Sequence, residues 1–162
     1  MIGIKVRKGS KCTHGIVSSQ LYSERNFYRS FKQDLKSAEG QVIIESPFMS
    51  ETRTKELLPF FKKLKKRGVK VTVYTRNPYQ HDHVLRQQGF IALKLLKKAK
   101  VKVKLCRDMR HRKLAIIDEK ILWEGSLNIL SQSHSKEIMR RSDSSELASD
   151  MLHFTGLKRW FC

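Results

Sequence analysis

The segment that decides the fold is residues 111–128, which read HRKLAIIDEKILWEGSLN. Two apolar runs rich in β-branched residues, 111–117 and 121–127, flank the charged residues 118–120. Runs of this length on either side of a short polar turn are typical of a β-hairpin. The sequence therefore predicts a hairpin whose turn lies near Asp118.

The predicted hairpin also indicates which polar side chains gather. Side chains alternate along a strand, and cross-strand partners share a face. With a two-residue loop, at 118–119 or at 119–120, four polar residues fall on one face: His111, Lys113, Ser126 and Asn128. Asp118 points to the other face, so we interpret it as a residue that orients the turn and not as a reacting group. An odd loop without a compensating bulge would overturn this arrangement.

These four residues have the chemistry of a phosphoryl-transfer site. The His111 imidazole can attack phosphorus and form a covalent intermediate, which splits one displacement into two. Charge on the non-bridging oxygens must be met by preorganised donors, and the Lys113 ammonium, the Asn128 amide and the Ser126 hydroxyl can donate. A neutral attacking imidazole cannot also protonate the leaving oxygen. The reaction therefore needs a second group, on the other side of the phosphate, that acts as the acid.

The spacing of these residues resembles the HKD signature of the phospholipase D superfamily. The full pattern reads His111-x-Lys113-x4-Asp118-x6-Gly125-Ser126-x-Asn128. Weaker likeness extends to residues 43–48 and 66–71, and it is closest to the nucleases of the superfamily that carry one motif per chain. The resemblance implies a phospholipase D-like fold, metal-independent phosphodiester cleavage and no cofactor, with Asp118 and Gly125 as structural residues of the motif.

Two glutamates, one within the motif and one beyond it, are relevant to this resemblance. Glu137 lies near the position where these proteins often carry a glutamate that hydrogen-bonds the catalytic histidine. A carboxylate there would fix the imidazole tautomer and stabilise its cationic form. Glu119 departs from the pattern, because a glycine is common after the motif aspartate. This departure bears on the tightness of the turn.

The chain has no second HKD motif that could supply a histidine as the acid. None of the other histidines begins a second His-x-Lys-x4-Asp pattern, and no second Gly-Ser-x-Asn exists; these histidines are His14, His81, His83, His134 and His153. The simplest hypothesis is a homodimer in which two hairpins meet at a two-fold axis. The partner subunit's His111 would then be the general acid. A metal site at 81–83 is the less favoured interpretation of that histidine pair, which is more typical of a loop.

Charge points to a polyanionic partner. The chain has 34 Lys and Arg against 15 Asp and Glu, a formal net charge of +19. Nucleic acid, DNA in the first place, is the commonest partner of so basic a domain. We expect four arginines to bind substrate: Arg76, Arg107, Arg110 and Arg112. Two alternatives stay open, a phospholipid-cleaving enzyme drawn to an anionic membrane surface and a catalytically silent nucleic-acid-binding module of a larger restriction or helicase assembly.

The organisation of the chain fits one domain, residues 1–162. Helices are expected over 24–38, 51–67, 82–99 and from a cap at Ser142 or Asp143 to about Phe154; strands are expected at 42–44, 69–75, 101–105 and 137–141. Their alternation predicts an α/β sandwich with a mixed, mostly parallel sheet flanked by helices and extended by the hairpin. Trp123 is expected in the core, on the hairpin face away from the site.

The remaining features favour a cytoplasmic protein. No run of 18 apolar residues exists, and the apolar part of the N-terminus is too short for a signal peptide. The three cysteines, Cys12, Cys106 and Cys162, are odd in number and widely spaced. This usage is typical of a reducing compartment.

Overall fold

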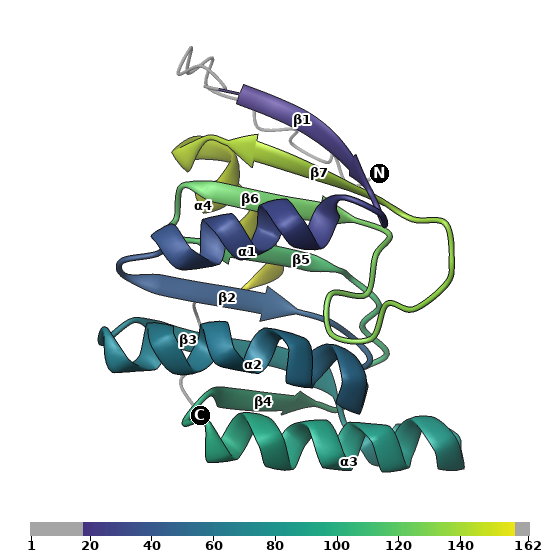
Figure 1. Ribbon diagram of the computed structural model, residues 1–162. Coiled ribbons are helices and arrows are strands. Elements are labelled where there is room, and N and C mark those ends of the chain that lie inside the picture. The colour runs from purple at the N-terminus through teal and green to yellow at the C-terminus, as the bar shows by residue number, and fades with distance from the viewer. Residues whose placement is uncertain (1–17, 158–162) are drawn as a thin grey trace, which may run out of the picture.

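The computed structural model describes residues 18–157 and shows a seven-stranded sheet with helices on both faces (Figure 1). Cys12, His14 and Cys162 lie outside the described residues, as do both ends of the expected domain. No helix within residues 18–157 is both long and apolar enough to cross a bilayer.

The elements follow the predicted alternation, with one strand added at the start. The strands are β1 Ser18–Ser23, β2 Gln41–Glu45, β3 Lys70–Arg76, β4 Lys102–Cys106, β5 Leu114–Ile117, β6 Ile121–Gly125 and β7 Ile138–Asp143. The helices are α1 Phe27–Ser37, α2 Glu51–Lys66, α3 His83–Lys98 and α4 Ser145–Thr155, with a short 3-10 turn, η1 Pro78–Gln80. Across the sheet the order is β1-β7-β6-β5-β2-β3-β4.

The mixed sheet is confirmed, but the expected parallel majority is wrong. Only β2, β3 and β4 pair in parallel, while the other four pairings are antiparallel. The two parallel pairings follow from the crossover helices α2 and α3, because parallel neighbours need a long connection. The hairpin, β7 and β1 add the antiparallel pairings. β1 was not predicted because it is an edge strand whose sequence, SSQLYS, is mostly polar and exposed.

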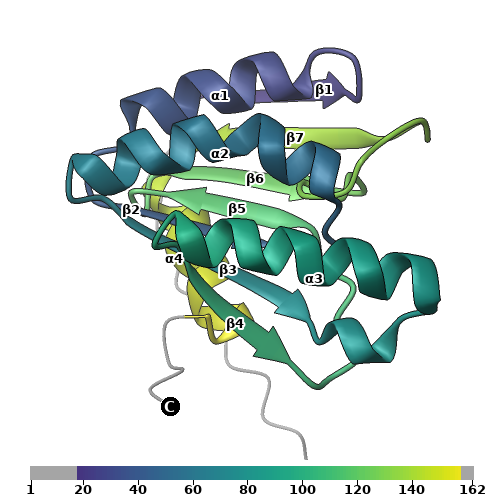
Figure 2. The same cartoon turned by 60° about the horizontal axis from the view of Figure 1, so that its bottom comes forward.

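The larger core lies between the sheet and the three helices α1, α2 and α3, which cover one face (Figures 1 and 2). Helical spacing places Phe27, Phe31 and Leu35 on the inner side of α1, where all three are fully buried. Trp123 of β6 packs against both phenylalanines, and its Nε1 donates to Asp34 Oδ2 at 2.7 Å. The prediction that Trp123 belongs to the core is confirmed.

Helix α4 covers a smaller core on the opposite face, which includes Ile43, Ile116 and Leu122. The Ser144 side chain caps this helix by accepting the Leu147 N–H at 3.3 Å. The predicted caps, Ser142 and Asp143, are wrong because both residues continue β7 to the end of its pairing with β1 and β6.

The hairpin is confirmed, but the face argument built on an even loop is wrong. Asp118 and Glu119 both adopt positive φ, 54° and 53°, and the Lys120 N–H closes this two-residue turn on the Ile117 carbonyl at 3.0 Å. However, the register pairs Ile117 with Ile121, so Lys120 is an extra residue on one side. One extra residue reverses which face each later side chain takes.

Candidate active site

His111 and Lys113 lie at the end of the sheet where the parallel strands finish. Strands β2, β3 and β4 end at Glu45, Arg76 and Cys106, and β5 begins nearby at Leu114 (Figure 1). Ligands in α/β sheets usually bind beyond these carboxyl ends. The segments after the three strands therefore form the candidate site.

His111 and Lys113 lie in contact, although neither belongs to a strand. The Lys113 Nζ is 2.5 Å from His111 Nδ1 and 3.4 Å from His111 Nε2. The same ammonium group donates to the His111 carbonyl at 2.6 Å. Because the two residues are only two positions apart in the chain, this contact does not depend on the hairpin register.

The surroundings of His111 favour its neutral form. Burial lowers the pKa of the imidazole, and the cations Lys113 and Arg76 lower it further. Burial also lowers the pKa of Lys113, against the opposing effect of the nearby Glu137 carboxylate. A neutral imidazole has a free lone pair and can act as a nucleophile near neutral pH.

Aromatic and cationic side chains complete the surroundings of His111. The Phe48 ring lies 5.8 Å from the His111 ring and 4.9 Å from the His81 ring, centroid to centroid. The Arg76 guanidinium lies 5.8 Å from the Phe48 centroid, and burial and Arg76 lower the pKa of His81. Arg76, an expected substrate contact, is thus close to the motif but only 8 % exposed. No sequence pattern pointed to Phe48, and His81 lies in the loop between η1 and α3, where it was expected.

Ser126 and Asn128 follow β6 and have no hydrogen bond to His111 in the described chain. The Ser126 hydroxyl accepts the Ile138 N–H at 3.1 Å, so it ties its loop to the start of β7. Asn128 Oδ1 is buried and has no hydrogen-bond partner among residues 18–157. A buried polar atom without a partner is uncommon in native proteins, which makes this amide a candidate ligand for a substrate oxygen.

Glu137 lies near Lys113, whose ammonium form it stabilises. Its Oε1 accepts the Ser135 hydroxyl at 2.8 Å, and no hydrogen bond joins it to His111 within the described residues. The expected Glu137 to His111 hydrogen bond is therefore not part of this conformation.

Asp118 and Gly125 both contact the backbone of neighbouring segments. The Asp118 carboxylate accepts three backbone N–H groups, of residues 39, 40 and 41, at 2.8 to 2.9 Å. It thereby fastens the hairpin turn to the connection between α1 and β2. A Cβ at Gly125 would lie 2.2 Å from the Ile138 carbonyl oxygen, so close approach of β7 requires a glycine there.

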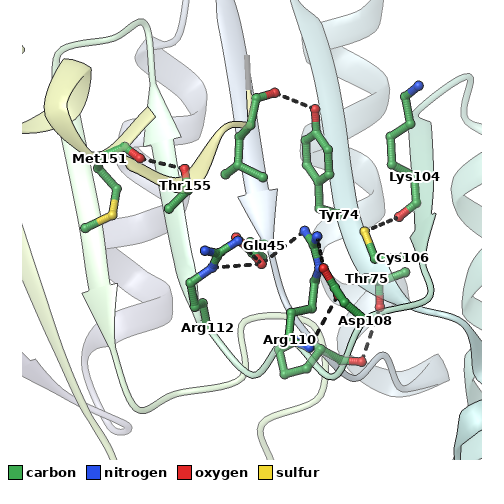
Figure 3. Close-up of polar contacts among 12 residues, drawn as sticks. Glu45, Tyr74, Thr75, Lys104, Cys106, Asp108, Arg110, Arg112, Met151 and Thr155 are labelled. Atoms are coloured by element: carbon green, nitrogen blue, oxygen red, sulfur yellow. Dashed lines mark hydrogen bonds and ion pairs between the residues drawn. The ribbon is translucent and has the colours of Figure 1, made fainter. Parts of the chain in front are cut away.

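The three remaining arginines have different environments. Arg110 and Arg112 form ion pairs with the Glu45 carboxylate, which is fully buried (Figure 3). Arg107 is exposed and has no ion pair within residues 18–157. The sequence pointed to the arginines but not to Glu45, because no local pattern shows that a strand residue 65 positions earlier meets Arg110.

Donors for a metal ion are sparse in this region. Within residues 18–157, no three or more His, Cys, Asp or Glu side chains are grouped so that they could hold one. The charged groups that act on the pKa of His111 are instead cations, Lys113 and Arg76.

Known proteins share the fold of this chain. A family model described as "Cardiolipin synthase, PLD-like domain" matches residues 31–154. No curated protein sequence matches the chain.

Solved structures with the same fold include NucT from Helicobacter pylori, with a TM-score of 0.69 and 22 % identity over 85 % of this chain and 92 % of that one. Nuc from Salmonella typhimurium, described as a phospholipase D family member, has a TM-score of 0.70 and 18 % identity over 88 % and 93 %. A phosphatidylserine synthase from Haemophilus influenzae has a TM-score of 0.63 and 11 % identity over 87 % of this chain and 38 % of that one.

Proposed function

Because the chain belongs to the phospholipase D superfamily, we propose that it is a metal-independent nuclease that cleaves DNA or RNA through a phosphohistidine. The observation that carries this proposal is the pair of His111 and Lys113. The imidazole has a lowered pKa, and a cation lies within 2.5 Å of it. A neutral nucleophile beside a fixed positive charge suits attack on an anionic phosphodiester.

The reaction has two displacements at phosphorus. In the first, a ring nitrogen of His111 forms a bond to phosphorus and the bond to the leaving oxygen breaks. The partner subunit's His111, in its imidazolium form, gives that oxygen its proton. In the second, water gives a proton back to the partner subunit's His111 and its oxygen attacks phosphorus, which breaks the N–P bond and restores both side chains.

Lys113 and Asn128 hold the phosphate oxygens in this scheme. A bound phosphodiester competes for the Lys113 ammonium, which draws the cation away from Nδ1 and toward the charge that shifts during attack. Rotation of the Asn128 amide by half a turn places its NH₂ where the unpartnered oxygen now lies. The exposed Ser126 hydroxyl is the third donor.

Nucleic acid is the proposed substrate because a group of exposed lysines lacks acidic partners. The second halves of α2 and α3 carry six exposed lysines: Lys62, Lys63, Lys66, Lys94, Lys97 and Lys98. None of them has an ion pair within the described residues. Clustered like charges repel one another, and a polyanion relieves that repulsion.

A phospholipid is the second candidate substrate, and an apolar groove favours it. The groove has a volume of about 490 Å³ and passes Lys113; its lining includes the exposed side chains Leu21, Ile138 and Phe154. An acyl chain could lie against these residues with the head group at Lys113.

The test is cleavage of labelled DNA, labelled RNA and phosphatidylglycerol vesicles in excess EDTA, with His111→Asn as the matched inactive variant. We expect the wild-type chain to cut nucleic acid and the variant to bind it without cutting. Cleavage of the vesicles alone would favour the lipid enzyme, and binding without any cleavage would favour a silent module. Strict dependence on added Mg²⁺ would contradict the metal-independent mechanism.

A further inference from the structure

A carboxylate that the proposed reaction does not use is fully buried behind the motif. Glu45 is the last residue of β2 and has an exposed fraction of 0 %. It lies in the interior of the sheet, opposite Leu114 of β5 and Tyr74 of β3. A charge in such a place persists only when it is paired, because removal from water is costly.

The partners of Glu45 are the two residues on either side of His111. Glu45 Oε1 lies 3.2 Å from Arg110 Nη1 and 3.1 Å from Arg112 Nη2. The Arg112 Nε also donates to both carboxylate oxygens at 3.2 Å. Figure 3 shows Glu45 between the two guanidinium groups. Contacts therefore alternate along the chain: residues 110 and 112 meet Glu45, while His111 and Lys113 meet each other.

Arg110 has a second carboxylate partner besides Glu45. The Asp108 carboxylate accepts from Arg110 Nε at 2.7 Å and from Arg110 Nη2 at 2.6 Å, a bidentate geometry. The Arg110 side chain is only 6 % exposed. Paired, two-point contacts of this kind fix orientation more strictly than a single ion pair does.

These ion pairs hold the backbone next to His111 in a segment that belongs to no strand. Residues 107–113 lie between β4 and β5 and are in neither strand, so strand pairing does not fix the backbone at His111. A nucleophile must nevertheless be held close to its attacking position, since a displacement of 1 Å can lower a rate about 100-fold.

We propose that Glu45 is a positioning residue for His111: its buried carboxylate binds the arginines on both sides of the nucleophile and thereby fixes the backbone that presents the imidazole. The proposal rests on the proposed function, in which His111 is the nucleophile. Within residues 18–157, the Glu45 side chain has hydrogen bonds to Arg110 and Arg112 and none to His111. It also gives Arg110 and Arg112 a role other than substrate contact.

The matched control is Asp34 of α1, another carboxylate that pairs with an arginine. Asp34 accepts from Arg141 at 2.8 and 3.0 Å and from Trp123, and its side chain is 14 % exposed. Replacing either carboxylate by its amide leaves an arginine partly unpaired and should lower the melting temperature. Only Glu45 holds arginines that adjoin His111.

The experiment measures kcat and KM for bis(p-nitrophenyl) phosphate, a small diester that avoids the lysine-rich helices. We expect Glu45→Gln to lower kcat by about tenfold or more with KM within about twofold, because a displaced nucleophile weakens the chemical step and not binding. Glu45→Asp should retain more of kcat than Glu45→Gln. Asp34→Asn should keep kcat within about twofold of wild type.

A second readout does not depend on turnover. NMR signals of the His111 ring, assigned by their absence in His111→Asn, should broaden or double in Glu45→Gln and stay unchanged in Asp34→Asn. If the wild-type chain cleaves no diester, the proposed function fails while these signals still test the positioning role. Unchanged ring signals in Glu45→Gln, an unchanged kcat, or an equal loss of kcat in Asp34→Asn would each overturn the proposal.

Arg112→Gln is the variant to use if Glu45→Gln does not fold. The Arg112 side chain is 40 % exposed. The substitution removes one of the two arginines that pair with Glu45, and Arg110 remains to pair with the buried carboxylate. A positioning role predicts a fall in kcat at constant KM, by about threefold or more. A rise in KM at constant kcat would instead show that Arg112 contacts substrate, and it would overturn the positioning role.

Discussion

The Nζ of Lys113 lies 2.5 Å from the Nδ1 of His111, so one cation both touches the proposed nucleophile and lowers its pKa. Burial is the larger cause of the lowered pKa, and the Lys113 charge adds to it. The pair therefore links the protonation state of the imidazole to the ammonium group that is proposed to bind a phosphate oxygen.

Removal of the Lys113 charge should raise the pKa of His111. A nearby cation disfavours imidazolium, so Lys113→Gln removes one cause of the low pKa and shifts the NMR titration of His111 to higher pH. Turnover should fall by about 100- to 1,000-fold, because a charge-stabilising donor is lost. Lys120→Gln, an exposed lysine at the hairpin turn, is the control and should change neither quantity. An unmoved titration in Lys113→Gln would contradict the assigned contact.

The rate should depend on pH with two limbs. The attacking His111 must be neutral, so kcat/KM should fall on the acid side as pH drops through the lowered pKa, below the usual imidazole value of about 6.5. The histidine that protonates the leaving oxygen must be charged, so the rate should also fall at higher pH. Both apparent pKa values belong to the coupled pair. A rate that rises steadily to pH 9 would argue against a histidine acid.

Asp118 should matter for stability before it matters for chemistry. Asp118→Ala removes the acceptor of three backbone N–H groups, and we expect it to lower the free energy of unfolding by about 1 to 3 kcal/mol. Asp150→Ala, an exposed aspartate on α4, should have little effect. Urea denaturation of the two variants provides the comparison. Equal stabilities would mean that the Asp118 contacts contribute nothing.

Gly125 should tolerate no side chain. An added methyl would lie 2.2 Å from the Ile138 carbonyl and 2.9 Å from Met139 Cα, so β7 must move. We expect Gly125→Ala to lower the free energy of unfolding by about 1 to 3 kcal/mol and to reduce turnover through the adjacent Ser126. Gly40→Ala, where the nearest contact is Asp118 Oδ1 at 3.3 Å, should cost less. The same denaturation measurement ranks the two.

Binding of nucleic acid should be strongly salt dependent and should involve the lysines of α2 and α3. Each duplex phosphate neutralised contributes about 0.9 to the slope of log affinity against log salt. A triple change of Lys66, Lys94 and Lys98 to Gln should reduce that slope. The control triple, Arg25, Arg29 and Lys120 to Gln, removes the same number of exposed charges and should reduce it less. Equal slopes for the two triples would place the contacts elsewhere.

The sequence allowed the elements with strong periodicity to be predicted. The spacing of Phe27, Phe31 and Leu35 indicated α1, and the spacing of the HKD motif pointed to His111 and Lys113. These signals are local, since they depend on residues a few positions apart. They are also largely independent of how the strands pair.

What could not be predicted depends on pairings between distant segments. One extra residue at Lys120 reversed the expected faces, although the turn itself lies at Asp118 and Glu119. The contacts of Glu45 with the arginines, and of Phe48 with His111 and His81, join loops at separate strand ends. Only the order of the strands in the sheet brings such residues together.

The most direct test of the shared site is the activity of isolated heterodimers of wild-type and His111→Ala chains, purified through two different tags. If the two copies of His111 serve as nucleophile and acid of one site, these heterodimers should be inactive, although each contains one intact histidine. Half of the wild-type turnover in the heterodimer, or full turnover by a monomer, would contradict the shared site.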